Sequence, residues 1–82
     1  MKSAEEIRTA VLEGIQKVKE RELIPLDDEQ PFEKFGLDSL DRMALMLEVE
    51  TRLHLDFGEK NPEEIPTIKD YIAYVQETWS DV

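Results

Sequence analysis

Three segments of the chain place their apolar residues at helical spacing, and this pattern constrains the fold more than any other feature. The first segment spans residues 4–19, and one face of it collects Ile7, Ala10, Val11, Ile15 and Val18. The last spans residues 68–79, with Ile68, Tyr71, Ile72, Val75 and Trp79 on one face. Ser3 with Glu6 predicts a capping box before the first segment, and Thr67 with Asp70 resembles a second cap. The pattern therefore predicts an all-α fold.

The connecting segments limit what else this fold contains. Residues 21–36 carry two prolines and no hydrophobic period, which predicts a long loop anchored inward by Leu23, Leu26, Phe32 and Phe35. Residues 56–66 leave room for at most one short helical turn between prolines. We therefore expect a small four-helix bundle, with three longer helices and one short helix before the last. With 82 residues it forms a single domain, 1–82, whose thin core makes a large enclosed active site unexpected.

The middle segment, "SLDRMALMLEVETRLHL", carries two apolar stripes on nearly opposite faces. The first stripe is formed by Leu45, Met46, Val49 and Leu53, and the second by Leu40, Met43, Ala44 and Leu47. An outer helix of a small bundle needs only one stripe. The second is explained by burial on both sides, by an accident of composition, or by a surface kept apolar for a partner or ligand. Acids flank this second stripe, namely Asp41, Glu48 and Glu50, and an apolar strip with acidic margins suits docking.

Composition excludes several function classes. Twenty Asp and Glu against ten Lys and Arg give a net charge of −10, which argues against nucleic acid and favours either partners with basic patches or solubility alone. The chain has no cysteine, so it forms no disulfide, zinc-thiolate site or catalytic thiol of its own. Its apolar runs are short, so we expect a cytoplasmic protein without membrane insertion. The acidic run "LDDEQ" lacks the spacing of a calcium loop and is expected to be solvated.

The start of the middle helix singles out Ser39. If Ser39 were the N-cap, Arg42 would fall at the third helical position, where a cation is disfavoured. If Asp38 is the N-cap, Asp41 falls there instead, which is the better register. In this register the Ser39 hydroxyl is not used for capping. It lies at a position where backbone amides favour a phosphate ester by about 0.3–1 kcal/mol. The alternative is that Asp and Ser are ordinary residues of a helix start.

An enzymatic role for this serine would need a nearby base. The only histidine, His54, lies fifteen residues further along the same predicted helix, roughly 22 Å away at 1.5 Å per residue. That distance rules out a nucleophile and base pair, and it places His54 at the helix C-terminus. Trp79 and the tyrosines fall mainly on the inner face of the last helix and are expected in the core.

The stretch "FGLDSLDRMALMLEVETRL" resembles the signature of acyl carrier proteins, in which an Asp-Ser-Leu triplet opens the second helix and the serine carries 4′-phosphopantetheine. The resemblance covers most of the chain, including a loop that ends in Phe-Gly, a short third helix near "EEIPT" and a last helix "IKDYIAYVQE". It implies a non-catalytic, monomeric carrier in which a phosphopantetheinyl transferase, using coenzyme A and magnesium, modifies Ser39. It also implies partner-facing residues, namely Asp38, Leu40, Asp41, Met43 and Leu47. The residues implied to line the core or an acyl pocket are Leu45, Met46, Val49 and Ile65.

Departures from the fatty-acid-synthesis pattern leave the partners open. Acid in the middle helix is diluted by Arg42, Ala44, Thr51 and Arg52, and "GEKNPEEIP" brings a lysine and two prolines near the short helix. The partners implied are acyl-loading and acyl-processing enzymes of fatty acid, lipid or polyketide-type biosynthesis. A specialised polyketide, nonribosomal or lipid-modification carrier is an alternative to the general fatty-acid carrier. An unmodified acidic helical adaptor is a further alternative.

Overall fold

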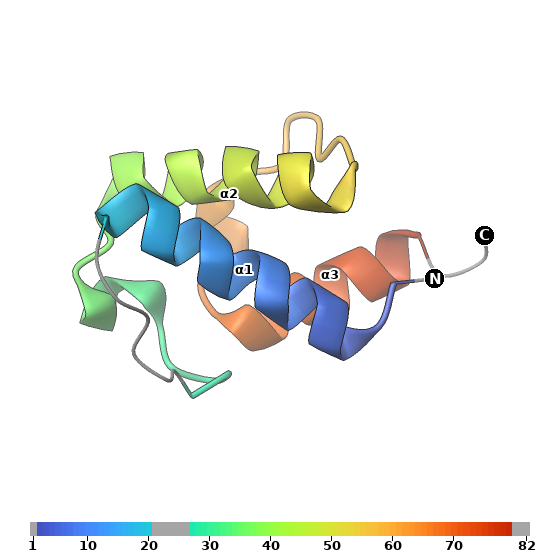
Figure 1. Ribbon diagram of the computed structural model, residues 1–82, viewed down its shortest axis with the longest axis horizontal. Coiled ribbons are helices and arrows are strands. Elements are labelled where there is room, and N and C mark those ends of the chain that lie inside the picture. Colours follow the sequence, from blue (N-terminus) through green and yellow to red (C-terminus); the bar gives the residue numbers. More distant parts are fainter. Residues whose placement is uncertain (1, 21–26, 80–82) are drawn as a thin grey trace.

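The computed structural model describes residues 2–20 and 27–79, and these residues form helices without any β-strand. The elements, in chain order, are α1 (Ala4–Lys19), the 3-10 turn η1 (Phe32–Phe35), α2 (Ser39–Leu53), the 3-10 turn η2 (Pro62–Glu64) and α3 (Ile68–Thr78) (Figure 1). The all-α prediction is confirmed. The predicted short fourth helix is only the three-residue turn η2, because Pro62 and Pro66 leave no room for a longer run. The described chain therefore holds three α-helices rather than four.

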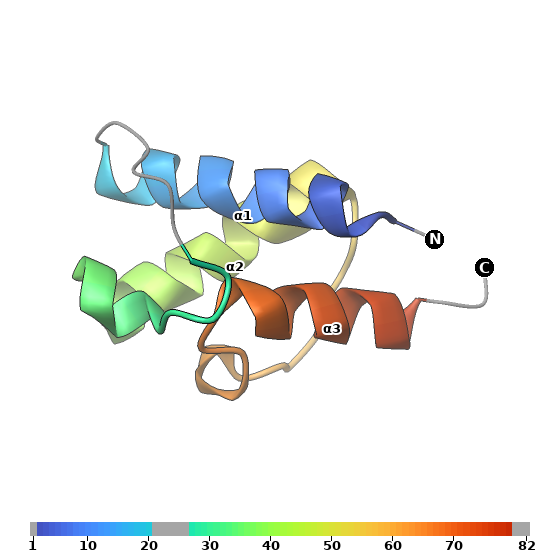
Figure 2. The same ribbon diagram turned by 90° about the horizontal axis from the view of Figure 1, so that it is seen from below.

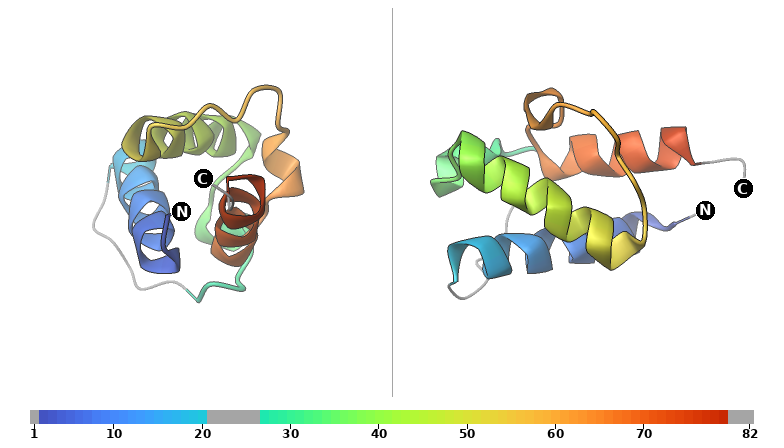
Figure 3. Two further views of the ribbon diagram at one scale, coloured as in Figure 1. Left: turned by 90° about the vertical axis from the view of Figure 1, so that its right-hand side faces the viewer. Right: turned by 90° about the horizontal axis from the view of Figure 1, so that it is seen from above.

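The helix α1 contacts both other helices, and η2 packs against α2. Figure 2 shows α1 and α3 running antiparallel, with Gln76 Nε2 donating to the Lys2 carbonyl over 3.4 Å where α1 begins and α3 ends. The end-on view in Figure 3 shows the three helices around a common centre, with η2 on the side between α2 and α3. The apolar faces meet in one core, which contains Ile7, Ala10, Val11, Ile15, Phe32, Leu37, Leu45, Met46, Val49, Leu53, Phe57, Ile65, Ile68, Tyr71 and Val75.

The contact between α1 and α2 depends on Gly14. A Cβ atom at this position would lie 2.7 Å from Leu45 Cδ1 and 3.3 Å from Glu48 Cβ. Both distances are shorter than an ordinary van der Waals contact. A glycine on the buried face of α1 costs helix propensity, and the close approach of α2 explains its presence there.

The helix boundaries follow the sequence closely, because their caps are local. The predicted range of α1 is confirmed, and Ser3 Oγ accepts from the Glu6 amide over 3.1 Å. The Glu6 carboxylate pairs with Lys2 at 3.5 Å, so only the Ser3 half of the predicted box is formed. Thr67 Oγ1 accepts from the Asp70 amide over 3.0 Å as expected, and α3 ends one residue before the prediction, with Trp79 as its C-cap.

The predicted long loop contains η1, which the sequence did not indicate. Phe32 is buried, its amide donates to the Pro66 carbonyl over 2.9 Å, and its ring meets the Tyr71 ring edge-on at 5.7 Å. Phe35 packs against the core from a half-buried position, as expected. Leu23 and Leu26 lie outside the described residues.

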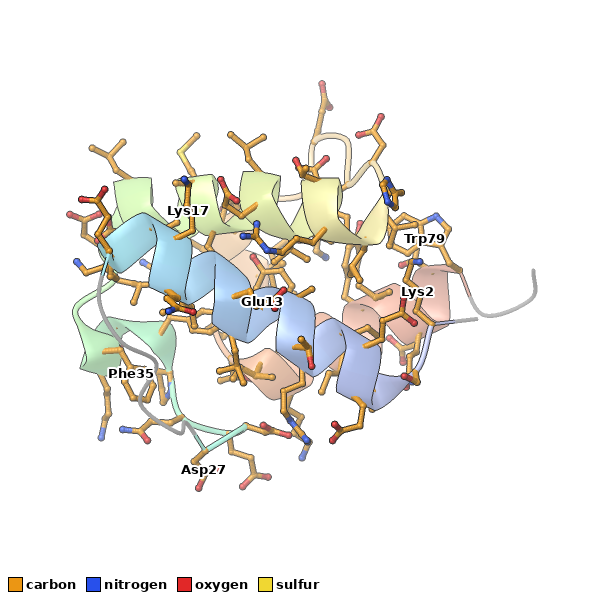
Figure 4. The ribbon with its side chains drawn as sticks, in the orientation of Figure 1. Lys2, Glu13, Lys17, Asp27, Phe35 and Trp79 are labelled. Atoms are coloured by element: carbon orange, nitrogen blue, oxygen red, sulfur yellow. The ribbon has the colours of Figure 1, made fainter. Side chains whose placement is uncertain are left out.

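In the acidic run before η1, Asp27 and Glu29 are exposed as expected, whereas Asp28 is not simply solvated. Asp28 is half-buried and accepts from Arg8 Nε over 3.0 Å, which fastens the loop to α1. Its carbonyl accepts from the Lys69 amide over 2.9 Å at the start of α3. Figure 4 labels the neighbouring Asp27 at the edge of the molecule, where its carboxylate accepts from the Glu29 amide over 3.0 Å. The segment thus ties α1 to α3.

The aromatic residues in and after α3 pack on the core as expected: Tyr71 is buried in it, and Tyr74 and Trp79 are half-buried against it. Trp79 lies 5.7 Å from the Phe57 ring and 5.8 Å from the Tyr74 ring between centroids. Phe57 also contacts Tyr71 at 6.3 Å, so the cluster joins the end of α3 to the segment after α2. Figure 4 shows Trp79 at the end of α3, on the same side of the molecule as Lys2.

Candidate functional site

The first turn of α2 adopts the register predicted from its capping residues. Asp38 is the N-cap, and its Oδ1 accepts from the Asp41 amide over 2.8 Å. Asp41 returns the bond, because its Oδ2 accepts from the Asp38 amide over 3.2 Å. These two bonds form a complete capping box and use both carboxylates for structure.

Ser39 is the first residue of α2, and it is exposed. Within the described part of the chain its hydroxyl takes no hydrogen bond, since Asp38 performs the capping. The turn before it passes through Gly36, whose φ of +82° is left-handed backbone that suits glycine, and the space beside this residue is open. The site is therefore an accessible hydroxyl on a rigid helix start.

A lysine from α1 braces this helix start. Lys19 Nζ lies 3.1 Å from Asp41 Oδ2 and 3.1 Å from the Gly36 carbonyl oxygen. The Lys19 hydrogen bond, together with the Asp38 amide, holds the pKa of the Asp41 carboxyl below its usual value. The last residue of α1 thus fastens both the turn before Ser39 and the first turn after it. Sequence reasoning missed this brace, because nothing local links residues so far apart.

The two stripes of α2 are an inner and an outer face. Leu40, Met43 and Leu47 are 76%, 56% and 65% exposed, whereas Ala44 is half-buried. The opposite stripe, Leu45, Met46, Val49 and Leu53, is buried in the core. Burial on both sides is therefore excluded as an explanation of the second stripe. We call Leu40, Met43 and Leu47 the outer strip, and Figure 4 shows side chains projecting from this side of α2 away from α1.

The acids beside the outer strip are engaged within the molecule. Asp41 is held by Lys19, and the Glu48 carboxylate pairs with Arg52 one turn along α2. Glu50 Oε2 accepts from the Phe57 amide over 3.1 Å. All three are half-buried, so they are less open to a partner than the sequence suggested. The exposed carboxylate next to Ser39 is that of Asp38.

The four residues expected to line the core or an acyl pocket, Leu45, Met46, Val49 and Ile65, are all buried. A pocket of about 200 Å³ opens between α2 and the segment around η2, lined by Met43, Met46, Leu47, Glu50, Gly58, Lys60 and Pro62. Of the four, only Met46 lines it. Ser39, Met43 and Met46 follow one another at spacings of four and three residues, so they share one side of α2.

Other chemistry is not gathered at this site. His54 is the C-cap of α2, at the opposite end of the helix from Ser39, in agreement with the sequence. No group of three or more potential metal ligands occurs among residues 2–20 and 27–79. Over those same ranges, no helix is long and apolar enough to cross a membrane.

Comparison with known families places the exposed serine in context. The sequence profile of the family described as "Phosphopantetheine attachment site" matches residues 9–75. The chain belongs to this family. Its prosthetic group is covalent 4′-phosphopantetheine, as the resemblance implied.

Three curated relatives of the chain share one name. The "Acyl carrier protein" of Rickettsia typhi and that of Rickettsia prowazekii are each 28% identical to the chain over 81 residues, covering 98% of it and 94% of the relative. The "Acyl carrier protein" of Rickettsia conorii shows the same identity and coverage, 28%, 98% and 94%. No solved structure gives a significant match. The prediction of a phosphopantetheine-carrying acyl carrier is thereby confirmed, and the comparisons name no pathway.

Proposed function

We propose that Ser39 Oγ is the attachment point of 4′-phosphopantetheine and that the protein is a non-catalytic carrier of acyl groups. The observation that carries this proposal is the exposed Ser39 hydroxyl at the first position of α2, which has no hydrogen-bond partner among residues 2–20 and 27–79 because Asp38 caps the helix. When bound, the prosthetic group supplies the thiol on which an acyl group is held as a thioester. The chain has no cysteine, so it has no such thiol of its own.

Ser39 takes part in the loading reaction as the nucleophile. Its hydroxyl oxygen bonds to the phosphorus that carries the pantetheine of coenzyme A, and the diphosphate P–O bond breaks. Adenosine 3′,5′-bisphosphate leaves, and the hydroxyl proton passes to a base of the phosphopantetheinyl transferase, which holds magnesium. The helix start favours the resulting phosphodiester anion by about 0.3–1 kcal/mol, and the exposed Asp38 carboxylate offsets part of this.

The outer strip is the proposed contact for partner enzymes. It provides exposed apolar side chains from the residue after Ser39 to about two turns further along α2, and the net charge of −10 attracts partners with basic patches. Asp38 and Asp41 mark the end of this surface next to the serine, although the Asp41 carboxylate is shared with Lys19. We expect these partners to be the transferase and enzymes that load and process acyl groups in fatty acid, lipid or polyketide-type biosynthesis. A specialised pathway would differ in its partner enzymes rather than in the attachment site.

The proposed shelter for the acyl chain lies inside α2, at Leu45, Met46, Val49 and Ile65. Burial of each CH2 group there would stabilise a bound chain by about 0.8 kcal/mol, less the strain of opening a tight core. The pocket at Met43 and Met46 supports this proposal, because it lies on the side of α2 that Ser39 shares. The turn η2, which lies beside it, takes the place of the fourth helix expected in this fold.

We propose one carrier domain over residues 1–82, acting as a cytoplasmic monomer. A single accessible serine with its prosthetic arm needs no residue from a second copy. The described core is continuous from α1 through α3, which supports one folding unit.

The proposal is tested by intact mass after co-expression with a broad-specificity phosphopantetheinyl transferase. The wild type should gain one phosphopantetheine and Ser39→Ala should gain none. Ser3→Ala is the matched control, because Ser3 is also an exposed serine at a helix start, and it should be modified like the wild type. An unmodified wild type would favour the adaptor alternative, and addition that persists in Ser39→Ala would refute the attachment site.

A further inference from the structure

Arg42, in the first turns of α2, stands out among the arginines. It is half-buried, and its Nε is buried with no hydrogen-bond partner in the part of the chain that the structure describes. The two other described arginines are paired: Arg8 with Asp28 and Glu5, and Arg52 with Glu48 and Glu13. Among the described residues the Arg42 side chain has no ion pair. A buried donor left unsatisfied is costly, and this chain has twice as many acids as bases, so the missing partner requires an explanation.

The acids nearest to Arg42 in the sequence are already engaged. Asp38 lies one helical turn before it, at a spacing that ordinarily permits an ion pair, but its Oδ1 accepts from the Asp41 amide. Asp41 is bound by Lys19 and by the Asp38 amide. The helix start therefore leaves a positive side chain beside carboxylates that are committed to capping.

Arg42 is also a neighbour of the proposed attachment site. It follows Ser39 by three residues on one helix, a spacing that places two Cβ atoms about 5–6 Å apart. Side chains on a helix lean toward its N-terminus, so the Arg42 side chain leans toward the turn of Ser39. A phosphodiester on Ser39 Oγ would lie within reach of a guanidinium at this position.

On the basis of the proposed attachment at Ser39, we propose that the Arg42 guanidinium binds the phosphodiester of the arm. A guanidinium suits this ligand because its N–H groups match two phosphate oxygens at once. Arg42 shares the inner face of α2 with the buried Val49, whereas Leu40 and Leu47 lie on the outer strip. Arg42 therefore acts as a positioning residue that holds the root of the arm on the inner side of α2, away from the outer strip.

The experiment compares unmodified and phosphopantetheinylated protein by NMR, after intact mass has shown the addition. We expect the Arg42 Nε–H signal to shift on modification and its exchange with water to slow, while the Arg52 signal stays in place. The phosphorus resonance of the modified wild type should differ from that of modified Arg42→Gln, and Arg42→Lys should restore part of the difference. Arg52→Gln is the matched control, since Arg52 is paired on the same helix, and it should leave the phosphorus resonance unchanged.

The outcomes separate this inference from the proposed function. Addition by mass with an unchanged Arg42 signal, or with the same phosphorus resonance in wild type and Arg42→Gln, would overturn the role of Arg42 and leave attachment at Ser39 intact. Absence of addition to the wild type would contradict the attachment itself. If Arg42→Gln does not fold, the role of Arg42 is tested by the wild-type protein alone, through the shift of its Arg42 Nε–H signal on modification.

Discussion

Replacement of Gly14 by alanine tests the contact between α1 and α2. In an exposed helix, this change would stabilise the fold by about 1 kcal/mol, because alanine has the better helix propensity. Here the new methyl carbon would lie 2.7 Å from Leu45 Cδ1 and 3.3 Å from Glu48 Cβ. Leu45 is fully buried, so its side chain has little space to move away.

The two effects oppose each other, and the steric one is expected to be the larger. Overpacking of a tight core costs about 1–3 kcal/mol. Set against the helix propensity gain, this predicts that Gly14→Ala lowers the free energy of unfolding by about 0–2 kcal/mol. In a domain of this size, each kcal/mol corresponds to about 4–8 °C in Tm.

The assay is urea unfolding of the unmodified protein, followed by far-UV circular dichroism. The pair Gln16→Gly and Gln16→Ala, at an exposed position of the same helix, measures the propensity effect by itself. In a Leu45→Val background the nearest clash is removed, so Gly14→Ala should become neutral or stabilising there. The reasoning would be refuted if Gly14→Ala stabilised the otherwise wild-type protein by the full difference in free energy of unfolding between Gln16→Ala and Gln16→Gly.

Two further predictions concern the outer strip and the core tyrosine. Leu47→Asn should slow modification by the transferase by about fivefold or more. Because Leu47 is exposed, the free energy of unfolding should change by less than about 0.5 kcal/mol. Thr9→Ala, on the exposed face of α1, is the control, and an equal modification rate in the two variants would argue against docking at the outer strip. Burial and the nearby Glu50 raise the pKa of the Tyr71 phenol in the folded protein above its value in the unfolded chain. The resulting stability is fully present below about pH 10. It is lost as the pH rises further, because the unfolded chain ionises first, by up to about 1.4 kcal/mol per pH unit. Urea unfolding between pH 8 and 11 should show this loss reduced in Tyr71→Phe and retained in Tyr74→Phe, and equal slopes in the wild type and Tyr71→Phe would contradict it.

The helices and the capping register of α2 were predictable because their signals are local. Apolar spacing defined the faces, and the choice between Asp38 and Ser39 as N-cap depended only on residues within one turn. These features needed no knowledge of which elements pack against each other. The same spacing revealed the second stripe of α2, but its exposure was not predicted, because burial on both sides stayed open until the packing was known.

The features that the sequence did not predict depend on distant partners. The turn η1 is four residues long, too short to show a period, and it is held by contacts of Phe32 with Pro66 and Tyr71. The brace between Lys19 and Asp41 and the pair between Arg8 and Asp28 join residues more than a helix apart in sequence. The sequence did single out Arg42 in one respect. A cation in the first turn of a helix is disfavoured, and this already argued against Ser39 as the N-cap of α2.

The bond between Lys19 and Asp41 closes a ring of chain across a sequence separation of 22 residues. Because the entropy of closing a ring grows only with the logarithm of its length, a doubling of the connection costs about 0.6 kcal/mol. Phe32 is fixed separately by the Pro66 carbonyl and Asp28 by Arg8, so we expect residues inserted between Glu20 and Asp27 to leave the turn before Ser39 unchanged. An insertion in this connection should therefore leave the position of Ser39 at the start of α2 unchanged.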